Sequence, residues 1–571
     1  MLRALVRKAR QVAGDPVLRQ WLLRRLKGGV SGPPPFAAHR PPYLNDMSAG
    51  KVESQDAAGT FHGLAAGPPK RPIELPLAGT NVALAPGDED GVFKRSFDDV
   101  ETLLALHRFA WVPLATDDGI AASWVQALWD AWRRDFGTSA GGWAWHPYTA
   151  AERAINLLDL AYKKGLPEPV AETAALLARH ANAIFEHLEY FGEHDTSNHL
   201  SNNGRGLFRL GLALGIGWAA DAGARILIEE AKRILMPSGV LREGSSHYHL
   251  LITRNYADTW LAARAYKRVE EDALRRITAR MLAVVPRLLL PGGLPLVGDV
   301  SPDSPPEYLL GLAGRESGWL AGLPDDRRSA LLALIDETRP VAAEQLAADG
   351  WLRFACGPWT GLWHAAPMGW PFMPGHGHQD AGGFELHFGD LPVFVDAGRG
   401  AYGETGDAAR YRSARVHNTV SVCGADPYPA NKPYYDDAFR LAVAGPPVVR
   451  SGDGEVSLEH GGFRRLEGVG SLRRQWRFTD KRMVLKDELA GRGVHPVARR
   501  FLTPLKAEAR AGGVTLRDGG RTFHLHSPDA TAKVGNATLW RAYGAGRPGT
   551  LIEFSGEASL PWSGEVWLEA S

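Results

Sequence analysis

The stretch Gly383-Phe-Glu-Leu-His-Phe388 decides the fold, because its apolar and polar residues alternate strictly. Its three apolar side chains oppose Glu385 and His387, and this period of two is typical of a half-buried strand. Similar alternation and turn signals such as Asp518-Gly-Gly520 recur towards the C-terminus. We therefore expect an antiparallel β-sandwich over residues 350–571.

Upstream of this region the apolar period is helical. Ala154, Leu157 and Leu158 share one face of a predicted helix, and similar spacing recurs over residues 97–349. Successive helices without intervening strands pack in pairs into a bundle, a solenoid or a toroid. A chain of 571 residues is too long for a single core. The predicted fold class is therefore a multidomain α+β protein with helices first and strands second.

Residues 1–96 form a third unit of different character. Residues 1–27 carry eight Lys and Arg against Asp15 alone, with apolar residues at helical spacing, which predicts a basic amphipathic helix. Three interpretations stay open: docking onto the rest of the chain, weak contact with an anionic membrane surface, or an atypical export signal. Glycine and proline clusters then predict an extended wrapping segment from Gly28 to about Pro86.

The composition excludes several classes of protein. The chain is 44% hydrophobic and 23% charged, and it lacks a run of apolar residues long enough to span a bilayer. Its two cysteines, Cys356 and Cys423, cannot build a disulfide framework or a cysteine-rich metal site. Because the body of the chain shows no basic stripe interleaved with aromatic residues, we expect no nucleic-acid partner.

Three stretches of the β region offer metal ligands: Pro374–Asp380, Val395–Gly398 and Val416–Val420. On an extended backbone His376 and His378 point the same way. Imidazoles together with a carboxylate suit Zn²⁺ or a similar borderline ion. The alternative is a set of hydrogen-bonded sheet histidines that bind no metal.

The helical region holds two further polar clusters. Asn198 and His199 stand where a helix is predicted to begin, so that Ser197 or Asn198 can be a simple helix cap. Tyr248 is flanked by two histidines on one helical turn. It can transfer a proton, or it can be a buried tyrosine with a satisfied hydroxyl.

In this order the motifs resemble the heparinase II/III family of polysaccharide lyases and its alginate-lyase relatives. The resemblance extends from about residue 107 to about residue 428. It implies an incomplete (α/α) toroid joined to an antiparallel β-sandwich, with the active cleft between them. The motifs that carry it are Trp145-His-Pro-Tyr148, Asn198-His199, Glu243 through Tyr248, Leu296-Val-Gly-Asp299, His376-Gly-His378, Asp396 and His417-Asn-Thr419.

The resemblance implies a role for each matched residue. Asn198 and His199 would meet a uronate carboxylate, while Tyr248 and His376 would act as catalytic acid and base in an order left open. One divalent ion of mainly structural role, Zn²⁺ in character, would be held by His378, Asp396 and His417. Asp380 and Asn418 are the predicted partners that orient the imidazoles. One departure is Arg412-Ser-Ala-Arg-Val416, where many relatives have Arg-Ser-Thr.

The implied activity is β-elimination on a uronic-acid-containing polysaccharide by a carbon–oxygen lyase, with an acidic polysaccharide as the partner. A glycoside hydrolase on the same toroid is one alternative, although its candidates Glu243, Asp299 and Asp303 lack a matched partner. A non-catalytic carbohydrate-binding or assembly protein of an exopolysaccharide pathway is another. The family implies the cell envelope or periplasm, but no signal peptide is visible, so the cytoplasm stays open.

Overall fold

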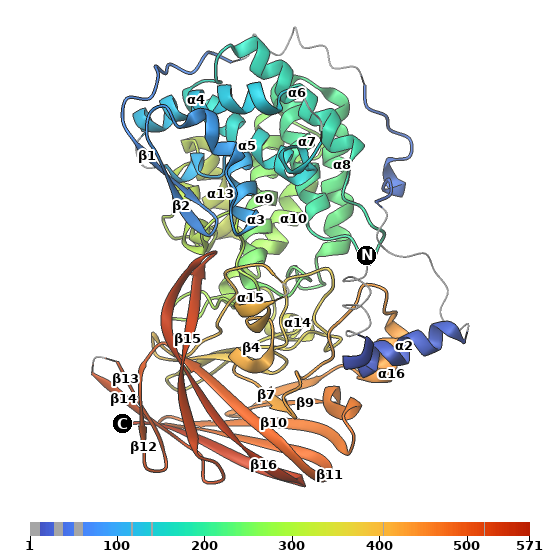
Figure 1. Cartoon of the computed structure of the whole chain (residues 1–571), viewed down its shortest axis with the longest axis vertical. Helices are drawn as coiled ribbons and strands as arrows, with labels where there is room; N and C mark the ends of the chain where they lie inside the picture. Colours follow the sequence, from blue (N-terminus) through green and yellow to red (C-terminus); the bar gives the residue numbers. More distant parts are fainter. Residues whose placement is uncertain are drawn as a thin grey trace.

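The structure is a computed structural model of the chain, and it stacks a helical domain on a β domain (Figure 1). The residues that it describes are 12–27, 38–50, 61–115, 118–138, 141–403, 405–518 and 520–571. Residues 1–11 of the predicted basic helix lie outside this part of the chain. The helix-then-strand order confirms the predicted fold class.

The helical domain is built from hairpin pairs: α5 packs on α6, α7 on α8 and α9 on α10. The pairs approach closely where small residues meet, and a Cβ added at Gly211 in α7 would lie 2.2 Å from the backbone nitrogen of Ala220 in α8. The helices are α3 (Val100–Arg108), α4 (Asp118–Phe136), α5 (Pro147–Lys164), α6 (Val170–Glu186), α7 (His199–Leu214), α8 (Gly217–Ile234), α9 (Ser246–Ala265), α10 (Glu271–Leu282), α11 (Val285–Leu288), α12 (Gly318–Ala321), α13 (Asp325–Glu337) and α14 (Ala343–Ala348).

The β domain contains two antiparallel sheets. The first has the order β3-β4-β5-β6, and the second follows β12-β13-β14-β16-β11-β10-β9-β8, with β15 paired to β16 and β7 paired to β11. Trp363 and Phe384 of the first sheet share a core with Trp476 of the second. The strands are β3 (Trp351–Cys356), β4 (Trp359–His364), β5 (Gly383–Phe388), β6 (Leu391–Phe394), β7 (Val420–Val422), β8 (Val448–Gly452), β9 (Glu455–His460), β10 (Val469–Thr479), β11 (Arg482–Thr503), β12 (Lys506–Arg510), β13 (Gly513–Asp518), β14 (Arg521–His526), β15 (Ala532–Ala542) and β16 (Ala545–Ala570).

Strand β5 differs from the predicted half-buried strand, because its polar face is buried as well. Glu385 is 4% exposed and His387 is 2% exposed. Glu385 accepts a hydrogen bond of 3.0 Å from the backbone N–H of Asp396. His387 accepts one of 3.0 Å from the backbone of Gly292 in the helical domain. The polar face of this strand therefore supplies one of the contacts between the two domains, through His387.

Two parts of the N-terminal unit depart from a simple wrapping segment. Strands β1 (Ile73–Leu77) and β2 (Thr80–Leu84) form a hairpin against the helical domain. Helix α2 (Pro16–Leu26) docks beside α16 (Asp437–Val443), where its Trp21 is 3% exposed and joins an aromatic cluster of the β domain. The described part of the basic segment therefore docks onto the β domain. No described helix is both long and apolar enough to cross a membrane.

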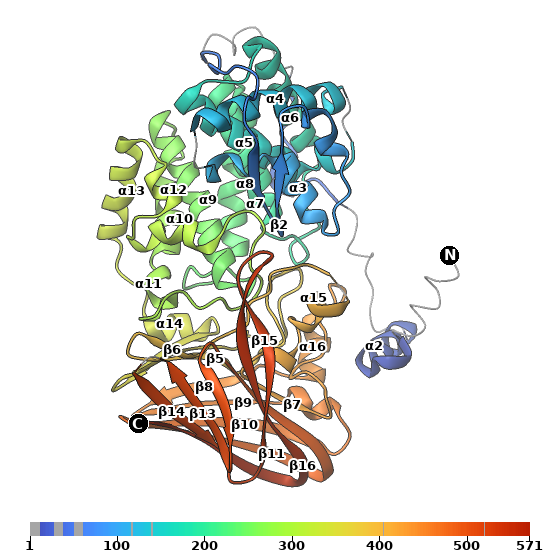
Figure 2. The ribbon, with the colours of Figure 1, turned by 60° about the vertical axis from the view of Figure 1, so that its left-hand side comes forward.

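The long hairpin of β15 and β16 rises from the β domain towards the helical domain, where its tip lies beside the β1–β2 hairpin (Figure 2). Tyr543 at this tip donates a hydrogen bond of 2.7 Å to Asp99 of the helical domain. Loops of the β domain meet the helical domain next to this contact. The polar residues singled out from the sequence gather at this junction.

Candidate active site

A cavity of about 480 Å³ opens at the junction of the two domains. The helical domain contributes His199 and Asp299, and the loops of the β domain contribute His376. Its lining contains the carboxylates of Asp299 and Asp426, but they are outnumbered by side chains that carry or can gain positive charge: His199, His376, His378, Arg399, Arg412 and Lys432. A wall of this kind suits an anionic ligand.

His376 is held by both domains. Its backbone N–H donates to the Glu243 carbonyl at 2.7 Å, and its carbonyl accepts from the Asp299 N–H at 2.9 Å. Its ring stacks on Tyr248 with 3.4 Å between ring centroids and 12° between the planes. The side chain is 15% exposed, so that it reaches the cavity from a rigid position.

Asp299 fixes the tautomer of His376. Burial alone would raise the pKa of the Asp299 carboxyl, but hydrogen bonds from His376 and His378 hold that pKa well below its usual range. An ionised carboxylate only accepts hydrogen bonds, so Nδ1 of His376, at 3.1 Å, must be the donor. Neutral His376 therefore carries its lone pair on Nε2, which faces Asn198 at 3.4 Å.

Asn198 precedes α7, but its side chain does not cap the helix. Its Nδ2 donates to Glu243 Oε2 at 2.6 Å, and its backbone N–H donates to Oε1 of the same carboxylate at 2.7 Å. Its Oδ1 is buried and finds no partner among the described residues. The helix-cap interpretation is therefore wrong for this side chain, which belongs to the cluster around His376.

His199 lies at the cavity wall with 43% of its side chain exposed. Its Nδ1 lies 2.8 Å from Glu189 Oε1. Burial would lower the pKa of His199, but the Glu189 carboxylate outweighs it and raises this pKa above its usual value. Sequence reasoning missed Glu189, which lies in the loop before α7 and carries no motif of its own.

Tyr248 lies behind His376 and is 5% exposed. Its hydroxyl oxygen is 2.5 Å from that of Tyr402. Burial, and then the negative charge of Asp303, raise the pKa of Tyr248 well above its usual value, so the phenol stays protonated at neutral pH. Of the four residues predicted to line one cleft, His199 and His376 reach the cavity, whereas Asn198 and Tyr248 lie directly behind it.

The three predicted metal ligands come together. One ligand atom from each of His378, Asp396 and His417 lies within 4.8 Å of the others, and all three residues are buried. Nε2 of His378 donates to ionised Asp299 at 2.9 Å, which leaves the lone pair on Nδ1. That nitrogen is buried and has no hydrogen-bond partner in the described part of the chain. An unpaired imidazole lone pair beside a carboxylate and a second imidazole fits a metal ion.

Of the three candidate ligands, His417 must lose a proton before it can bind a metal ion. Burial would lower its pKa, but Asp396, 2.8 Å from Nδ1, raises the pKa of His417 to about 9. Its Nε2 lies 3.0 Å from the Tyr411 carbonyl. A bound cation would take the place of the Nδ1 proton, so metal binding releases a proton here.

The prediction that Asp380 and Asn418 orient the metal-binding imidazoles is wrong. Asp380 pairs with His364 at 3.1 Å instead of with a metal ligand. Asn418 ties strands together by donating to the Phe384 and Val395 carbonyls and accepting from Leu502. The imidazoles are oriented by Asp299 and by the Tyr411 carbonyl.

The carboxylates that a glycosidase would need already accept hydrogen bonds from other side chains. Glu243 accepts from Asn198, Asp299 from two histidines and from Arg399 at 3.1 Å, and Asp303 from Arg108 at 2.8 Å and Tyr148 at 2.5 Å. A hydrolase needs two carboxyl groups that face one bond and a water molecule. The arrangement therefore disfavours hydrolysis.

Residues 338–566 match the family described as "Heparinase II/III-like, C-terminal". This part of the chain is a heparinase II/III-like domain. No curated protein sequence matches the chain. The predicted resemblance is thus confirmed for the β domain and the segment that leads into it.

Solved structures resemble the chain over both domains. Heparinase III has a TM-score of 0.62 at 15% identity, covering 92% of this chain and 86% of that one. A heparinase III gene product has a TM-score of 0.56 at 16% identity, covering 97% and 91%. A mutant heparan sulfate lyase from Pedobacter heparinus has a TM-score of 0.53 at 16% identity, covering 93% and 86%. At these identities the likeness shows a shared fold of toroid and β-sandwich.

Proposed function

We propose that this chain is a polysaccharide lyase that cleaves a uronic-acid-containing polysaccharide by β-elimination. One observation carries the proposal: His376 is stacked on Tyr248, in contact with Asn198, at the wall of a cavity rich in cationic side chains. The heparinase II/III-like β domain and the lyases of similar fold support it.

The substrate carboxylate binds beside Asn198 and His199. Removal of the C5 proton spreads negative charge onto this carboxylate, and donors placed there in advance stabilise that charge. One N–H of the Asn198 amide is engaged by Glu243, and the other lies on the side of His376. His199 adds positive charge whenever it is protonated.

His376 is the base and Tyr248 the acid in this mechanism. Asp299 holds the proton of His376 on Nδ1, so Nε2 can accept the C5 proton. Tyr248 keeps its proton at neutral pH and can give it to the oxygen of the leaving sugar. The bond to that oxygen breaks as the C4–C5 double bond forms, so no water is consumed.

We also propose that the ion held by His378, Asp396 and His417 is Zn²⁺, since two imidazoles and one carboxylate are among its usual ligands. When bound, the ion supplies a structural cross-link. His378 and His376 share Asp299, so fixing the first also fixes the second.

The test is a panel of acidic polysaccharides incubated with the purified chain. Elimination leaves a conjugated double bond, so ultraviolet absorbance should rise with at least one uronate polymer. The rise should be absent with His376→Ala. Fragmentation without absorbance would indicate a hydrolase, and an uncut polymer that still binds would indicate a binding protein.

A further inference from the structure

Helix α2 packs against the β domain through one side. Val17 is 4% exposed and Trp21 is 3% exposed, and both belong to an aromatic cluster with Tyr435 and with Phe439 of α16. The ring of Trp21 lies 4.6 Å from that of Tyr434. Figures 1 and 2 both show the helix at the periphery of the molecule. The helix is thus held by its buried side and presents its other side outwards.

The side of α2 that points outwards carries two leucines. Leu23 is 57% exposed and Leu26 is 84% exposed. Because successive residues of an α-helix are separated by about 100°, these leucines lie on the opposite side from Val17 and Trp21. A single exposed leucine is ordinary on a protein surface, but two neighbours on one helix face mark a candidate contact surface.

Basic side chains surround these leucines. Arg19 and Lys27 are exposed, and they share about 100° of the helix circumference with Leu23 and Leu26. These four residues are the outward face of α2. Arg24 is exposed at the border of this face. Among the described residues, no Asp or Glu forms an ion pair with a basic side chain of this helix. The outward face therefore combines unpaired positive charge with exposed apolar area.

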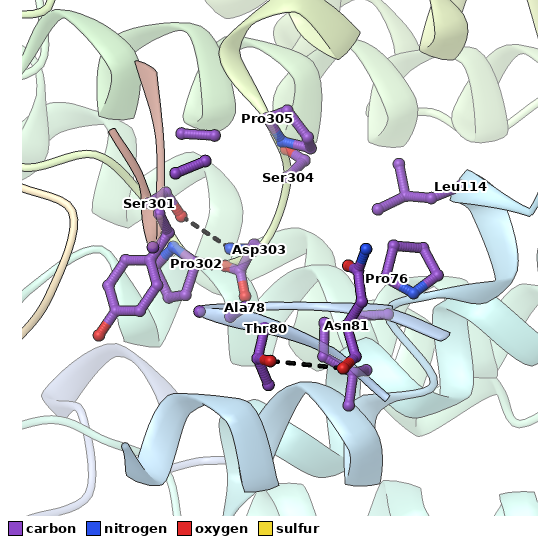
Figure 3. A pocket seen from close by; sticks show the side chains of 17 residues that line it. Pro76, Ala78, Thr80, Asn81, Leu114, Ser301, Pro302, Asp303, Ser304 and Pro305 are labelled. Carbon is purple, nitrogen blue, oxygen red and sulfur yellow. Dashed lines mark hydrogen bonds between the residues drawn. The ribbon is translucent and has the colours of Figure 1, made fainter. Parts of the chain in front are cut away.

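The charged residue of a pocket at the domain junction is paired, unlike those of α2. Asp303 lines a pocket of about 360 Å³ between the β1–β2 turn and the loop of residues 301–305 (Figure 3). Its carboxylate accepts hydrogen bonds from Arg108 at 2.8 Å and from Tyr148 at 2.5 Å. The outward face has no such internal partner in the described part of the chain, so its charge is available to a separate molecule.

Charge complementarity decides which partner fits. Residues 1–11 carry four Arg and Lys and no Asp or Glu, so they repel the outward face. A second copy of the chain docked through the same face would bring like charges together. An acidic polysaccharide matches the charge but offers no apolar interior for leucine. An anionic lipid surface offers both, because its head groups attract basic residues and its acyl chains receive apolar side chains.

We infer that the outward face of α2 attaches this protein to an anionic lipid surface. Docking onto the β domain and contact with the membrane are compatible, because they use opposite sides of one helix. Each basic residue near such a surface strengthens binding only about fivefold, and the two leucines enter only the head-group region. The attachment is therefore weak and reversible. The inference does not rest on the proposed lyase function.

The experiment is co-sedimentation of the full chain with two kinds of vesicle, phosphatidylcholine alone and an equal mixture of phosphatidylcholine and phosphatidylglycerol. The wild-type protein should bind the mixed vesicles and leave them as the salt concentration rises. Leu23→Gln/Leu26→Gln should weaken the binding by about 10- to 100-fold, because the apolar contribution is lost. Arg19→Gln/Lys27→Gln should weaken it by about 10- to 30-fold, because two charges are lost.

Two control variants change exposed residues outside α2. Val269→Gln/Val494→Gln removes apolar side chains that are 92% and 61% exposed. Lys506→Gln/Lys533→Gln removes two exposed charges. Both controls should bind the mixed vesicles like the wild type. All four variants should melt at the wild-type temperature, because none of the changed side chains is buried.

Three results would overturn the inference. One is equal binding of the wild type to both kinds of vesicle, and another is the same loss of binding in the controls as in the α2 variants. The third is a leucine variant that binds the mixed vesicles like the wild type, because a face that acts through charge alone fits an acidic polysaccharide. Co-sedimentation with a polyuronate, retained by the wild type and lost by Arg19→Gln/Lys27→Gln, would then identify the polysaccharide as the partner.

Discussion

His376 and His378 are two residues apart in the chain, yet they lie in different surroundings. His376 is 15% exposed and reaches the cavity, whereas the side chain of His378 is completely buried. Asp299 accepts a hydrogen bond from each. The free nitrogen of His376 is Nε2, which faces Asn198 at 3.4 Å, and the free nitrogen of His378 is Nδ1, in the cluster with Asp396 and His417. One residue type thus serves two purposes, set by burial and by the direction of the free nitrogen.

The largest effect expected from this difference is on turnover. His376→Ala removes the base, so turnover should fall by about 10³-fold, which is in the range of general acid–base catalysis. Its melting temperature and metal content should match those of the wild type, because the metal ligands are untouched. The measurements are initial rates by absorbance, a thermal melt and metal analysis. Loss of the metal together with activity would break the distinction between the two histidines.

His378→Ala should show the opposite pattern. The substitution removes one hydrogen-bond donor from the buried, ionised carboxylate of Asp299 and removes one candidate metal ligand, so the free energy of unfolding should fall by about 3 kcal/mol. Metal content should fall with it. Denaturant unfolding and metal analysis test both. A variant as stable as the wild type, with activity intact after exhaustive chelation, would mean that these histidines bind no metal.

Asp299→Asn sharpens the comparison, because this carboxylate contacts both histidines. An amide no longer fixes the tautomer of His376, so kcat should fall by about 10- to 100-fold. Stability should fall as well, since His378 and Arg399 lose an ionised partner. Asp349→Asn is the matched control, because Asp349 is a buried aspartate away from both histidines whose carboxylate accepts a hydrogen bond of 2.7 Å from the backbone N–H of Ser238. It should change stability without changing kcat.

The smallest expected effect is the pH dependence of substrate binding. The pKa of His199 is raised by Glu189, so its charged pairing stabilises the fold fully below pH about 6.5 and is lost as the pH rises through the raised value. KM for a uronate polymer should rise over the same interval, by no more than about fivefold because the His199 side chain is 43% exposed and solvent screens its charge. His199→Gln should flatten this rise. An identical profile in the variant would assign the titration to another group.

The fold class could be predicted because the change from a helical to a two-residue period is a local property of the sequence. The residues around His376 could be named because their order along the chain resembles that of a family. The role of Asp299 could not, because its partners lie 77 and 79 positions away. The prediction for Asp380 is wrong for the converse reason: it lies only two residues after His378 in the sequence, but its carboxylate pairs with His364.

The claim that the chain catalyses elimination is tested most directly by the mass of its products. A defined uronate-containing oligosaccharide is incubated with wild-type protein and with His376→Ala, and the fragments are weighed by mass spectrometry. The account predicts fragments whose masses add up to that of the substrate, one of them carrying the conjugated double bond, and no fragments from the variant. Fragments that together exceed the substrate by one water would contradict it and show hydrolysis.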